Sequence, residues 1–418
     1  MSKVRLVSSV LFLAALAAAA SAESWTQFRG PRRDGVSRET GLLRSWPAEG
    51  PRVLWSLAVA QGYSGAAVEG GKVYFNDYDE GAGEWLVRAV ALADGRELWR
   101  FREARRIRPN HGITRTVPAV DGERVFSFDP KAVLHALDAA TGAELWRKNL
   151  VEEYKTTIPP WYNGQCPLIE EGRLLVAPAG DALVVALDKA TGKELWRTPN
   201  PEGWPLSHAS LMPARLAGVD QYLFNTLAGT VGVAADDGRL LWHYPFKFNV
   251  SVSPSPLAVD GERVYLTAGY DAGGAMLKVS RNGDGAFAAE GLFVHTPDVW
   301  NSEIHTPIVW QDHLYAVGKL KRGLFTCLDK DGKVVWTSAG QASFEMGSFL
   351  LADGMFFVLD GKTGMLRLIE AGTGGYEELA RAQVLAGHDV WAPMALSGGK
   401  LVLRDLSRMV CLEVGRGS

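Results

Sequence analysis

Aromatic and histidine side chains recur ahead of eight short strand-like segments that are rich in small residues. Four of the chain's eight histidines and four of its fourteen tryptophans fall at these positions. Rings mixed with hydrogen-bonding groups are typical of sites for flat or extended ligands. The side chains that we expect to contact such a ligand are Tyr63, His111, Arg115, Trp161, Asn163, Trp204, His208, Trp300, Glu303, His305, Glu345, His388 and Trp391. The alternative is that these rings only fill the connections between neighbouring units.

Glu303 and His305 are two residues apart in a strand-like segment, so both side chains are expected on one face. A zinc or calcium ion there would need further ligands from other segments, such as His208 or Asp389. We expect a hydrogen-bonded pair rather than a metal centre. If the protein is an enzyme, Asp389 and Glu303 are the preferred general bases, with Glu345 as a third carboxylate.

Known catalytic motifs are missing from the chain. The sequence has no Ser-His-Asp signature, no phosphate-binding loop and no His-Glu-x-x-His motif. The residues alone therefore leave open a binding protein, an oxidoreductase, and a hydrolase or lyase.

A repeated eleven-residue cassette indicates the strands and turns that must position these residues. In Ala186–Trp196, an alanine, an aspartate, a glycine and a tryptophan occupy positions one, three, seven and eleven. A second full copy is Ala136–Trp146, and weaker copies end at Trp99, Trp242 and Trp336. Repetition at this scale indicates stacked units that cannot bury their apolar faces alone.

Each cassette residue has a physical role. The aspartate side chain can accept hydrogen bonds from backbone N–H groups of the turn, and the glycine supplies a positive φ. The large ring is expected to pack over the neighbouring unit. The docking residues predicted in this way are Trp99, Trp146, Trp196, Trp242 and Trp336. Two units lack the tryptophan, with Phe293 and Leu379 or nearby residues in its place.

The spacing of the units is 43 to 52 residues, which fits four strands each. Val53–Ala58 resembles the last strand of a unit, yet no cassette precedes it, and the C-terminal unit has only three strands of its own. We therefore expect Val53–Ala58 to pair with Met409–Val414 and close a ring.

The cassette resembles the tryptophan-docking motif of quinoprotein-type β-propellers. This group includes alcohol dehydrogenases that use pyrroloquinoline quinone (PQQ) and the outer-membrane assembly factor BamB. The resemblance covers most of the chain and implies an all-β protein, an eight-bladed β-propeller of four-stranded antiparallel blades. It also implies that the residues ahead of each first strand lie on the channel face, which carries the cofactor in the enzymes. The motif is specific for the fold and not for a function.

The sequence departs from both kinds of relative. It has no adjacent cysteine pair like the one beside PQQ in many of the enzymes, and no Cys-x-x-Cys-His haem motif. Its cysteines, Cys166, Cys327 and Cys411, are far apart in strand-like sequence, which favours buried apolar packing. We expect a non-catalytic binding or scaffold protein without a cofactor, and the alternative is a PQQ- and calcium-dependent dehydrogenase of alcohols or polymers.

The N-terminal sequence indicates where the protein is located and how the chain is divided. Lys3 and Arg5, an apolar run and an Ala-Ser-Ala site before Glu23 predict a secretory signal, so the protein is expected to be periplasmic or secreted. We divide the chain into a signal at residues 1–22, an N-terminal extension at 23–51 and a propeller at 52–415. No later apolar run has spanning length.

Partners are expected to be a protein segment or a polysaccharide bound at the channel face by a monomer. The net charge of −3 predicts neither nucleic acid nor anionic membrane as a partner. In the extension, Trp25 and Phe28 are expected to pin the segment to the propeller.

Overall fold

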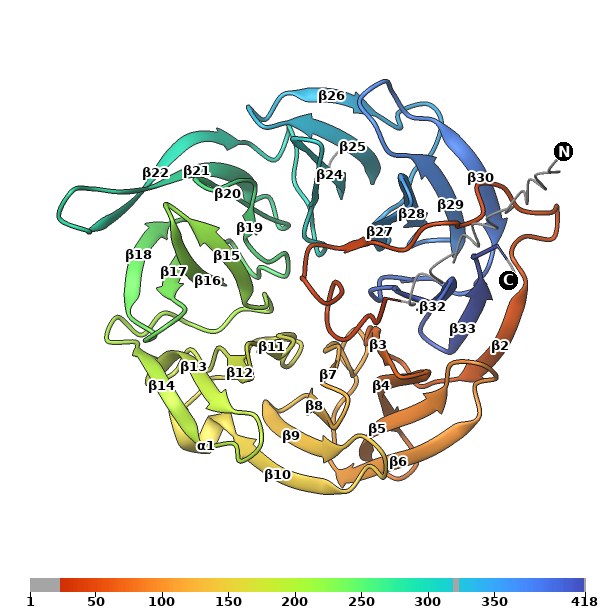
Figure 1. Ribbon diagram of the computed structural model, residues 1–418, viewed down its shortest axis with the longest axis horizontal. Helices are drawn as coiled ribbons and strands as arrows, with labels where there is room; N and C mark the ends of the chain where they lie inside the picture. Colours follow the sequence, from red (N-terminus) through yellow and green to blue (C-terminus); the bar gives the residue numbers. More distant parts are fainter. Residues whose placement is uncertain (1–22, 319–322, 417–418) are drawn as a thin grey trace, which may run out of the picture.

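The protein is a ring of β-sheets arranged around a central axis (Figure 1). The computed structural model describes residues 23–318 and 323–416. Within these residues the strands form eight sheets of four or five strands, and α1 (Leu150–Tyr154) is the one helix. The predicted all-β, eight-bladed propeller is confirmed. The predicted signal at residues 1–22 lies outside the described residues.

The first four blades follow one another along the chain, each with its first strand near the axis and its last strand at the rim (Figure 1). Blade one has β3 (Ala66–Glu69), β4 (Lys72–Asp79), β5 (Glu84–Ala91) and β6 (Glu97–Ala104). Blade two has β7 (Ala119–Val120), β8 (Arg124–Phe128), β9 (Val133–Asp138) and β10 (Glu144–Asn149). Blade three has β11 (Leu168–Glu170), β12 (Arg173–Val176), β13 (Ala182–Asp188) and β14 (Glu194–Pro199). Blade four has β15 (Met212–Leu216), β16 (Val219–Thr226), β17 (Gly229–Ala234) and β18 (Leu240–Pro245).

The other four blades complete the ring, and the last of them takes a strand from the N-terminal part of the chain. Blade five has β19 (Leu257–Ala258), β20 (Arg263–Ala268), β21 (Gly273–Arg281) and β22 (Phe287–His295). Blade six has β23 (Ile308–Trp310), β24 (His313–Gly318), β25 (Leu324–Asp329) and β26 (Val334–Thr337). Blade seven has β27 (Phe349–Ala352), β28 (Met355–Leu359), β29 (Met365–Glu370) and β30 (Glu378–Gln383), with β1 (Val36–Ser37) added parallel to β27. Blade eight has β31 (Ala395–Ser397), β32 (Lys400–Arg404), β33 (Arg408–Glu413) and β2 (Val53–Ala58).

Ring closure follows the sequence-based expectation. Strand β2 pairs antiparallel with β33, and Trp55 lies opposite Cys411. The two ends of the chain therefore complete one blade, and the sheet order leaves no gap in the ring. The first strands begin later than expected, however. Regular pairing starts at Ala66 rather than Ser64, and at Leu257 rather than Ser251, because the intervening residues form the loops that lead toward the axis.

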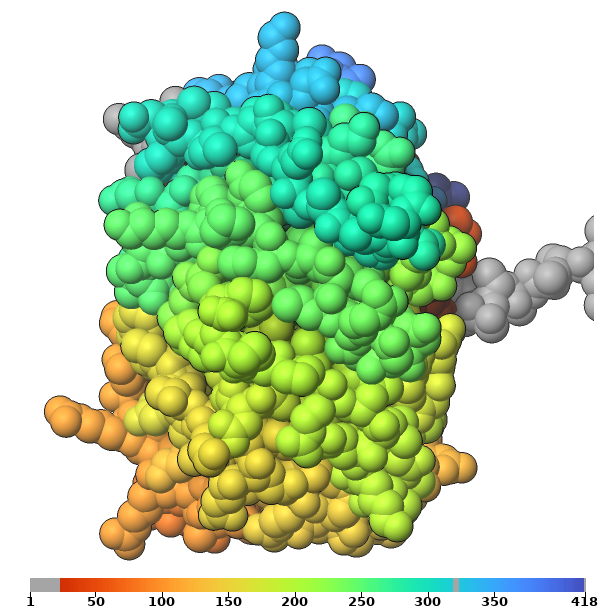
Figure 2. Space-filling view, turned by 90° about the vertical axis from the view of Figure 1, so that its left-hand side faces the viewer, coloured from red at the N-terminus to blue at the C-terminus, as the bar shows by residue number. Residues whose placement is uncertain are grey.

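Burial explains why the strands of a blade have different sequences. All but the last residue of β13 is buried, since neighbouring blades cover both faces of the sheet interior. In the outer strand β14 half-buried and exposed residues alternate along most of its length, and one residue, Thr198, is buried. Seen from the side, successive segments of the chain form a continuous outer wall (Figure 2).

The cassette tryptophans pack from one blade onto the next. Gly142 has φ of 76°, and a methyl group built on it would lie 2.5 Å from the Trp99 ring. The Trp99 indole N–H also donates to the Ala139 carbonyl, at 3.1 Å. Only glycine fits both the positive φ and the ring contact. The same pairing joins Trp55 to Gly95, Trp146 to Gly192 and Trp196 to Gly238.

Four blades vary this contact. Phe293 replaces tryptophan in blade five, and its ring lies against Gly332 of blade six. The Trp336 indole donates to the Gly372 carbonyl of blade seven at 3.0 Å. Trp242 differs, because its indole N–H donates to Gln221 of its own blade at 2.8 Å. In blade seven the tryptophan position, opposite Leu368, is held by Ala380.

Candidate functional site

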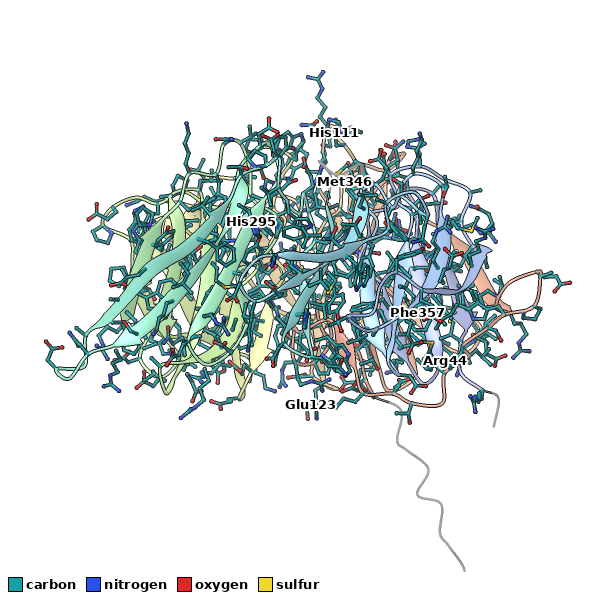
Figure 3. All side chains as sticks on the ribbon, turned by 90° about the horizontal axis from the view of Figure 1, so that it is seen from above. Arg44, His111, Glu123, His295, Met346 and Phe357 are labelled. Carbon is teal, nitrogen blue, oxygen red and sulfur yellow. The ribbon has the colours of Figure 1, made fainter. Side chains whose placement is uncertain are left out.

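A pocket of about 290 Å³ opens around the ring axis on one face of the disc. The loops that lead into the first strands supply most of its lining, and every blade contributes. The residues that line it are Phe28, Tyr63, His111, Arg115, Trp161, Gly164, Cys166, His208, Ser210, Ser251, Ser253, Tyr270, Glu303, Ile304, His305, Met346, Trp391 and Pro393. Figure 3 shows His111 and Met346 on this face, and Glu123 and Arg44 on the opposite face.

The structure brings eight of the thirteen predicted contact residues into this pocket. They come from the loops ahead of six blades, so residues far apart in sequence converge on the axis. The eight are Tyr63, His111, Arg115, Trp161, His208, Glu303, His305 and Trp391. Their binding of a ligand stays a prediction.

Five predicted contact residues lie elsewhere. Trp300 is 1% exposed and packs in the core beside Tyr265, so its expected place at the rim is wrong. Trp204 stacks on His243 with ring centroids 4.1 Å apart. Both rings fill space within or between blades, as the alternative interpretation of the aromatic pattern proposed.

The remaining three are polar. Asn163 is buried away from the pocket lining, and neither its side-chain oxygen nor its side-chain nitrogen has a hydrogen-bond partner among the described residues. Glu345 and His388 are exposed, outside the pocket lining. The His388 ring lies 3.4 Å from the Asp389 carboxylate, which also lies outside the lining.

The Glu303–His305 segment does not form the expected strand. It bends ahead of β23, and Glu303, Ile304 and His305 all line the pocket instead of alternating between two faces. The Glu303 carboxylate packs against Gly269, where a methyl group would lie 2.3 Å from the carboxyl carbon. The turn between β20 and β21 thus holds this side chain in place.

The N-terminal extension closes the other end of the pocket. Residues in red in Figure 1 cross the middle of the ring, and Phe28 lines the pocket. Arg33, which is fully buried, donates to the carbonyls of Leu211, Cys166 and Pro167. Arg29 donates to the Thr306 and Pro307 carbonyls at 2.6 and 2.8 Å. The segment therefore ties blades three, four and six together across the axis.

Burial without a carboxylate partner explains the electrostatics of this segment. It lowers the pKa of Arg29 and of Arg33 to about 10, so both remain charged at neutral pH. Among the described residues, their hydrogen-bond acceptors are backbone carbonyls. Trp25, also in this segment, pairs with Val68 of β3 through two backbone hydrogen bonds.

Two histidines of the pocket are held neutral. Burial lowers the pKa of His208 to about 4, with a further contribution from the charge of Arg115. The His208 Nε2–H donates to the Pro160 carbonyl at 2.7 Å, so Nδ1 accepts from the Ser251 hydroxyl at 2.8 Å. Burial likewise lowers the pKa of His305 to about 4, and its Nε2–H donates to the Met346 carbonyl.

Aromatic pairs form two sides of the pocket. Tyr63 stacks on Trp391 with centroids 5.2 Å apart, and Trp161 stacks on Tyr270 with centroids 6.0 Å apart. Trp161 and Tyr270 have φ of 65° and 53°, which large side chains rarely adopt. Backbone strain of this kind concentrates where a protein must hold a functional geometry.

A short contact between blades places Tyr63 beside Arg115. Gly62 forms a parallel bridge with Thr114, and a methyl group on it would lie 2.2 Å from the threonine hydroxyl. Only glycine allows this approach. The Arg115 guanidinium consequently lies over the Tyr63 ring, 5.8 Å from its centroid.

Sequence reasoning missed Tyr270, Ser253 and Met346 among others. Tyr270 comes from the turn between β20 and β21, which is not one of the loops that lead into a first strand. The sequence pattern that could have identified Tyr270 is weak, because no cassette precedes this turn. Phe28 was expected to pin the extension, and the structure also places it in the pocket lining.

Comparison with known proteins identifies the family. The family described as outer membrane protein assembly factor BamB matches residues 83–309, which is more than half of the 418-residue chain. The chain belongs to this BamB family. No curated protein sequence matches the chain.

Solved structures show the same fold at low identity. BamB from Moraxella catarrhalis has a TM-score of 0.61 and 14% identity, over 88% of this chain and 98% of that chain. A quinohemoprotein alcohol dehydrogenase from Comamonas testosteroni has a TM-score of 0.65 and 13% identity, over 94% of this chain and 81% of that chain. A europium-containing methanol dehydrogenase has a TM-score of 0.65 and 15% identity, over 92% of this chain and 90% of that chain. The fold is therefore shared by BamB and by quinone enzymes.

The pocket of this BamB-family chain does not fit PQQ with a metal ion. Each aromatic pair is closed on itself, with centroids 5.2 and 6.0 Å apart, which leaves no space for a third ring between its members. Glu303 is the one carboxylate in the lining, whereas calcium takes about 6–8 oxygen ligands. Across residues 23–318 and 323–416, no three His, Cys, Asp or Glu side chains are grouped to hold a metal.

Other features of the chain are structural. Cys166, Cys327 and Cys411 are separate, buried thiols. Arg102 of β6 pairs with Glu84 of β5 at 2.9 Å, within the outer hairpin of blade one. In the described part of the chain, helix α1 has five residues, and no helix there is long and apolar enough to cross a membrane.

Proposed function

We propose that this protein is an exported, non-catalytic propeller that binds a protein segment in the pocket on its channel face. The observation that carries the proposal is the state of the pocket histidines. Both ring nitrogens of His208 are engaged with Pro160 and Ser251, and His305 is tied to Met346. A neutral ring with both nitrogens engaged, as in His208, supplies neither a general base nor a metal ligand.

The shape of the pocket supports the same reading. Eight blades and the N-terminal extension enclose it on all sides but one, and aromatic rings form its walls. Such a site suits a short extended segment or a few side chains. A polysaccharide is the other ligand class with that shape, and binding measurements separate the two.

Export and organisation follow the sequence. We propose that residues 1–22 are a leader removed on export to the periplasm or the medium, that residues 23–51 are an extension, and that residues 52–415 are the propeller. The described part of the mature chain is proposed to act as a monomer. No partner is needed to complete the pocket, because one chain supplies all eight blades.

The test fills the pocket without changing the rest of the molecule. Ser253 is half-buried in the lining, so Ser253→Trp places a bulky ring in the cavity. Glu123→Trp adds the same ring on the opposite face, where the Glu123 side chain is 79% exposed (Figure 3). Both variants and the wild type are panned against a random-peptide display library.

The proposal predicts peptides that bind wild type and Glu123→Trp alike and bind Ser253→Trp at least about tenfold more weakly. The proposal would be contradicted by peptides that bind Ser253→Trp as tightly as the wild type, or by a library that yields no binder. Immobilised oligosaccharides serve as the second arm, and their pocket-dependent binding would replace the protein segment by a sugar.

A further inference from the structure

Arg115 is a cation at the pocket that the protein does not neutralise. Its Nη2 donates to the Asn110 and His111 carbonyls at 2.8 and 2.7 Å, and its Nη1 reaches the Ile113 carbonyl at 3.5 Å. A guanidinium has five donor hydrogens, so Nε–H and one Nη1–H have no recorded partner among the described residues. The side chain is thus anchored by carbonyls and still able to donate.

Arg115 lies among tyrosine side chains at the pocket. The groups that interact with its charge are the hydroxyls of Tyr63, Tyr162 and Tyr270, and no carboxylate of the described chain pairs with it. By contrast, Arg102 of β6 pairs with the Glu84 carboxylate, and Arg105 of the following loop pairs with the Asp129 carboxylate. Desolvation lowers the pKa of Arg115 to about 10, so the group is charged at neutral pH and gains from an anion.

The surroundings of Arg115 select the anion. Tyr63 lies under the guanidinium and stacks on Trp391, so flat apolar walls flank the charge. Glu303 lines the same pocket, so repulsion is stronger for a ligand group with two negative charges than for one with a single charge. A single carboxylate matches one arginine, whereas a phosphate dianion would face one cation and one carboxylate.

We propose that the segment bound in the pocket carries a carboxylate, from an Asp or Glu side chain or from a chain terminus, that accepts hydrogen bonds from Arg115. This inference rests on the proposed function and specifies its ligand. It assigns Arg115 as the residue that selects the ligand's charge, with Tyr63 and Trp391 as the walls beside the carboxylate.

The experiment uses the peptides selected above by pocket-dependent binding. Each is synthesised as selected and with every acidic group neutralised, by Glu→Gln, Asp→Asn and C-terminal amidation. Affinities are measured by calorimetry for wild type, Arg115→Gln and Arg108→Gln. Arg108 is exposed in the neighbouring loop and does not line the pocket, so its variant removes the same charge from the same face.

We expect the neutralised peptides to bind wild type about 10- to 100-fold more weakly, as for a lost charge-assisted hydrogen bond. Arg115→Gln should lower affinity for the acidic peptide to a similar degree and abolish its preference over the neutral one. Arg108→Gln should leave both unchanged. The peptide substitution reads out the interaction even if Arg115→Gln folds poorly.

Three outcomes separate the two proposals. Acid-dependent binding that disappears in Arg115→Gln supports the inference. Pocket-dependent peptides that tolerate neutralisation and bind Arg115→Gln normally overturn it and leave the proposed function standing. A library without pocket-dependent peptides removes the proposed function and the inference together.

Discussion

Tryptophan and arginine are used in two regions of this propeller, and their surroundings differ. Between the blades, the Trp99 indole donates to Ala139, and across the axis Arg33 is fully buried and bonded to three carbonyls. At the pocket, Trp161 is half-exposed in a left-handed backbone conformation, and Arg115 keeps donors without a partner. The same side chains stabilise the ring where they are buried and remain available for a ligand where they are half-buried at the pocket.

Arg33→Met gives the largest expected effect on stability. The substitution leaves the carbonyls of Cys166, Pro167 and Leu211 without their donor, at about 1–3 kcal/mol each, so we expect a loss of about 3–5 kcal/mol. Denaturant unfolding measures the change. Arg115→Gln, whose carbonyl partners lie in exposed loops, should lose less than about 1 kcal/mol. Equal losses would erase the distinction between the two arginines.

Trp99→Ala tests the docking contact. The ring is 8% exposed and lies on Gly142 of the next blade, so its removal should lower the free energy of unfolding by about 3–5 kcal/mol. Trp161→Ala is the matched variant at the pocket, with an expected loss of about 1 kcal/mol and weaker peptide binding. A Trp99 variant as stable as wild type would mean that the ring does not hold the blades together.

His208 makes stability depend on pH. Its pKa is about 4 in the folded protein, below the ordinary value of about 6.5 in the unfolded chain. The unfolded state therefore binds more protons between these values, so stability is full above pH 6.5 and falls as the pH drops toward 4. The contribution is up to about 3 kcal/mol. In His208→Gln the decline of the unfolding free energy over this window should become shallower.

We expect the protein not to reduce a dye in the presence of PQQ, calcium and an alcohol. Purified protein incubated with PQQ and calcium is assayed over a panel of alcohols, and we expect no turnover, because the aromatic pairs leave no space for a quinone between their rings. Robust reduction that disappears in Glu303→Gln or Asp389→Asn would favour the dehydrogenase over the binding protein.

The ring itself was predictable from sequence because its determinants are local. A cassette such as Ala186–Trp196 carries the strand, the turn and the docking ring within eleven residues, and the orphan strand β2 revealed the closure. The pocket is built from loops whose directions depend on the whole ring. Trp300 and Trp161 occupy similar sequence positions, yet one packs in the core and the other lines the pocket.

Two contributions to the pocket could not be predicted from the local sequence. Tyr270 reaches Trp161 from a hairpin turn two blades farther along the chain. Arg33 and Phe28 reach the axis because the extension threads across the ring, which no periodicity in the sequence encodes. Long-range placement of this kind is decided by backbone hydrogen bonds that form only after the blades have assembled.

Amide hydrogen exchange, with and without a saturating acidic peptide selected by its pocket-dependent binding, tests the central claim most directly. The account predicts added protection in residues 110–115 and 161–166, which carry the pocket rim, and none in residues 121–124 on the opposite face (Figure 3). Protection confined to the opposite face or to the outer strands, with the rim residues exchanging as in the free protein, would contradict it.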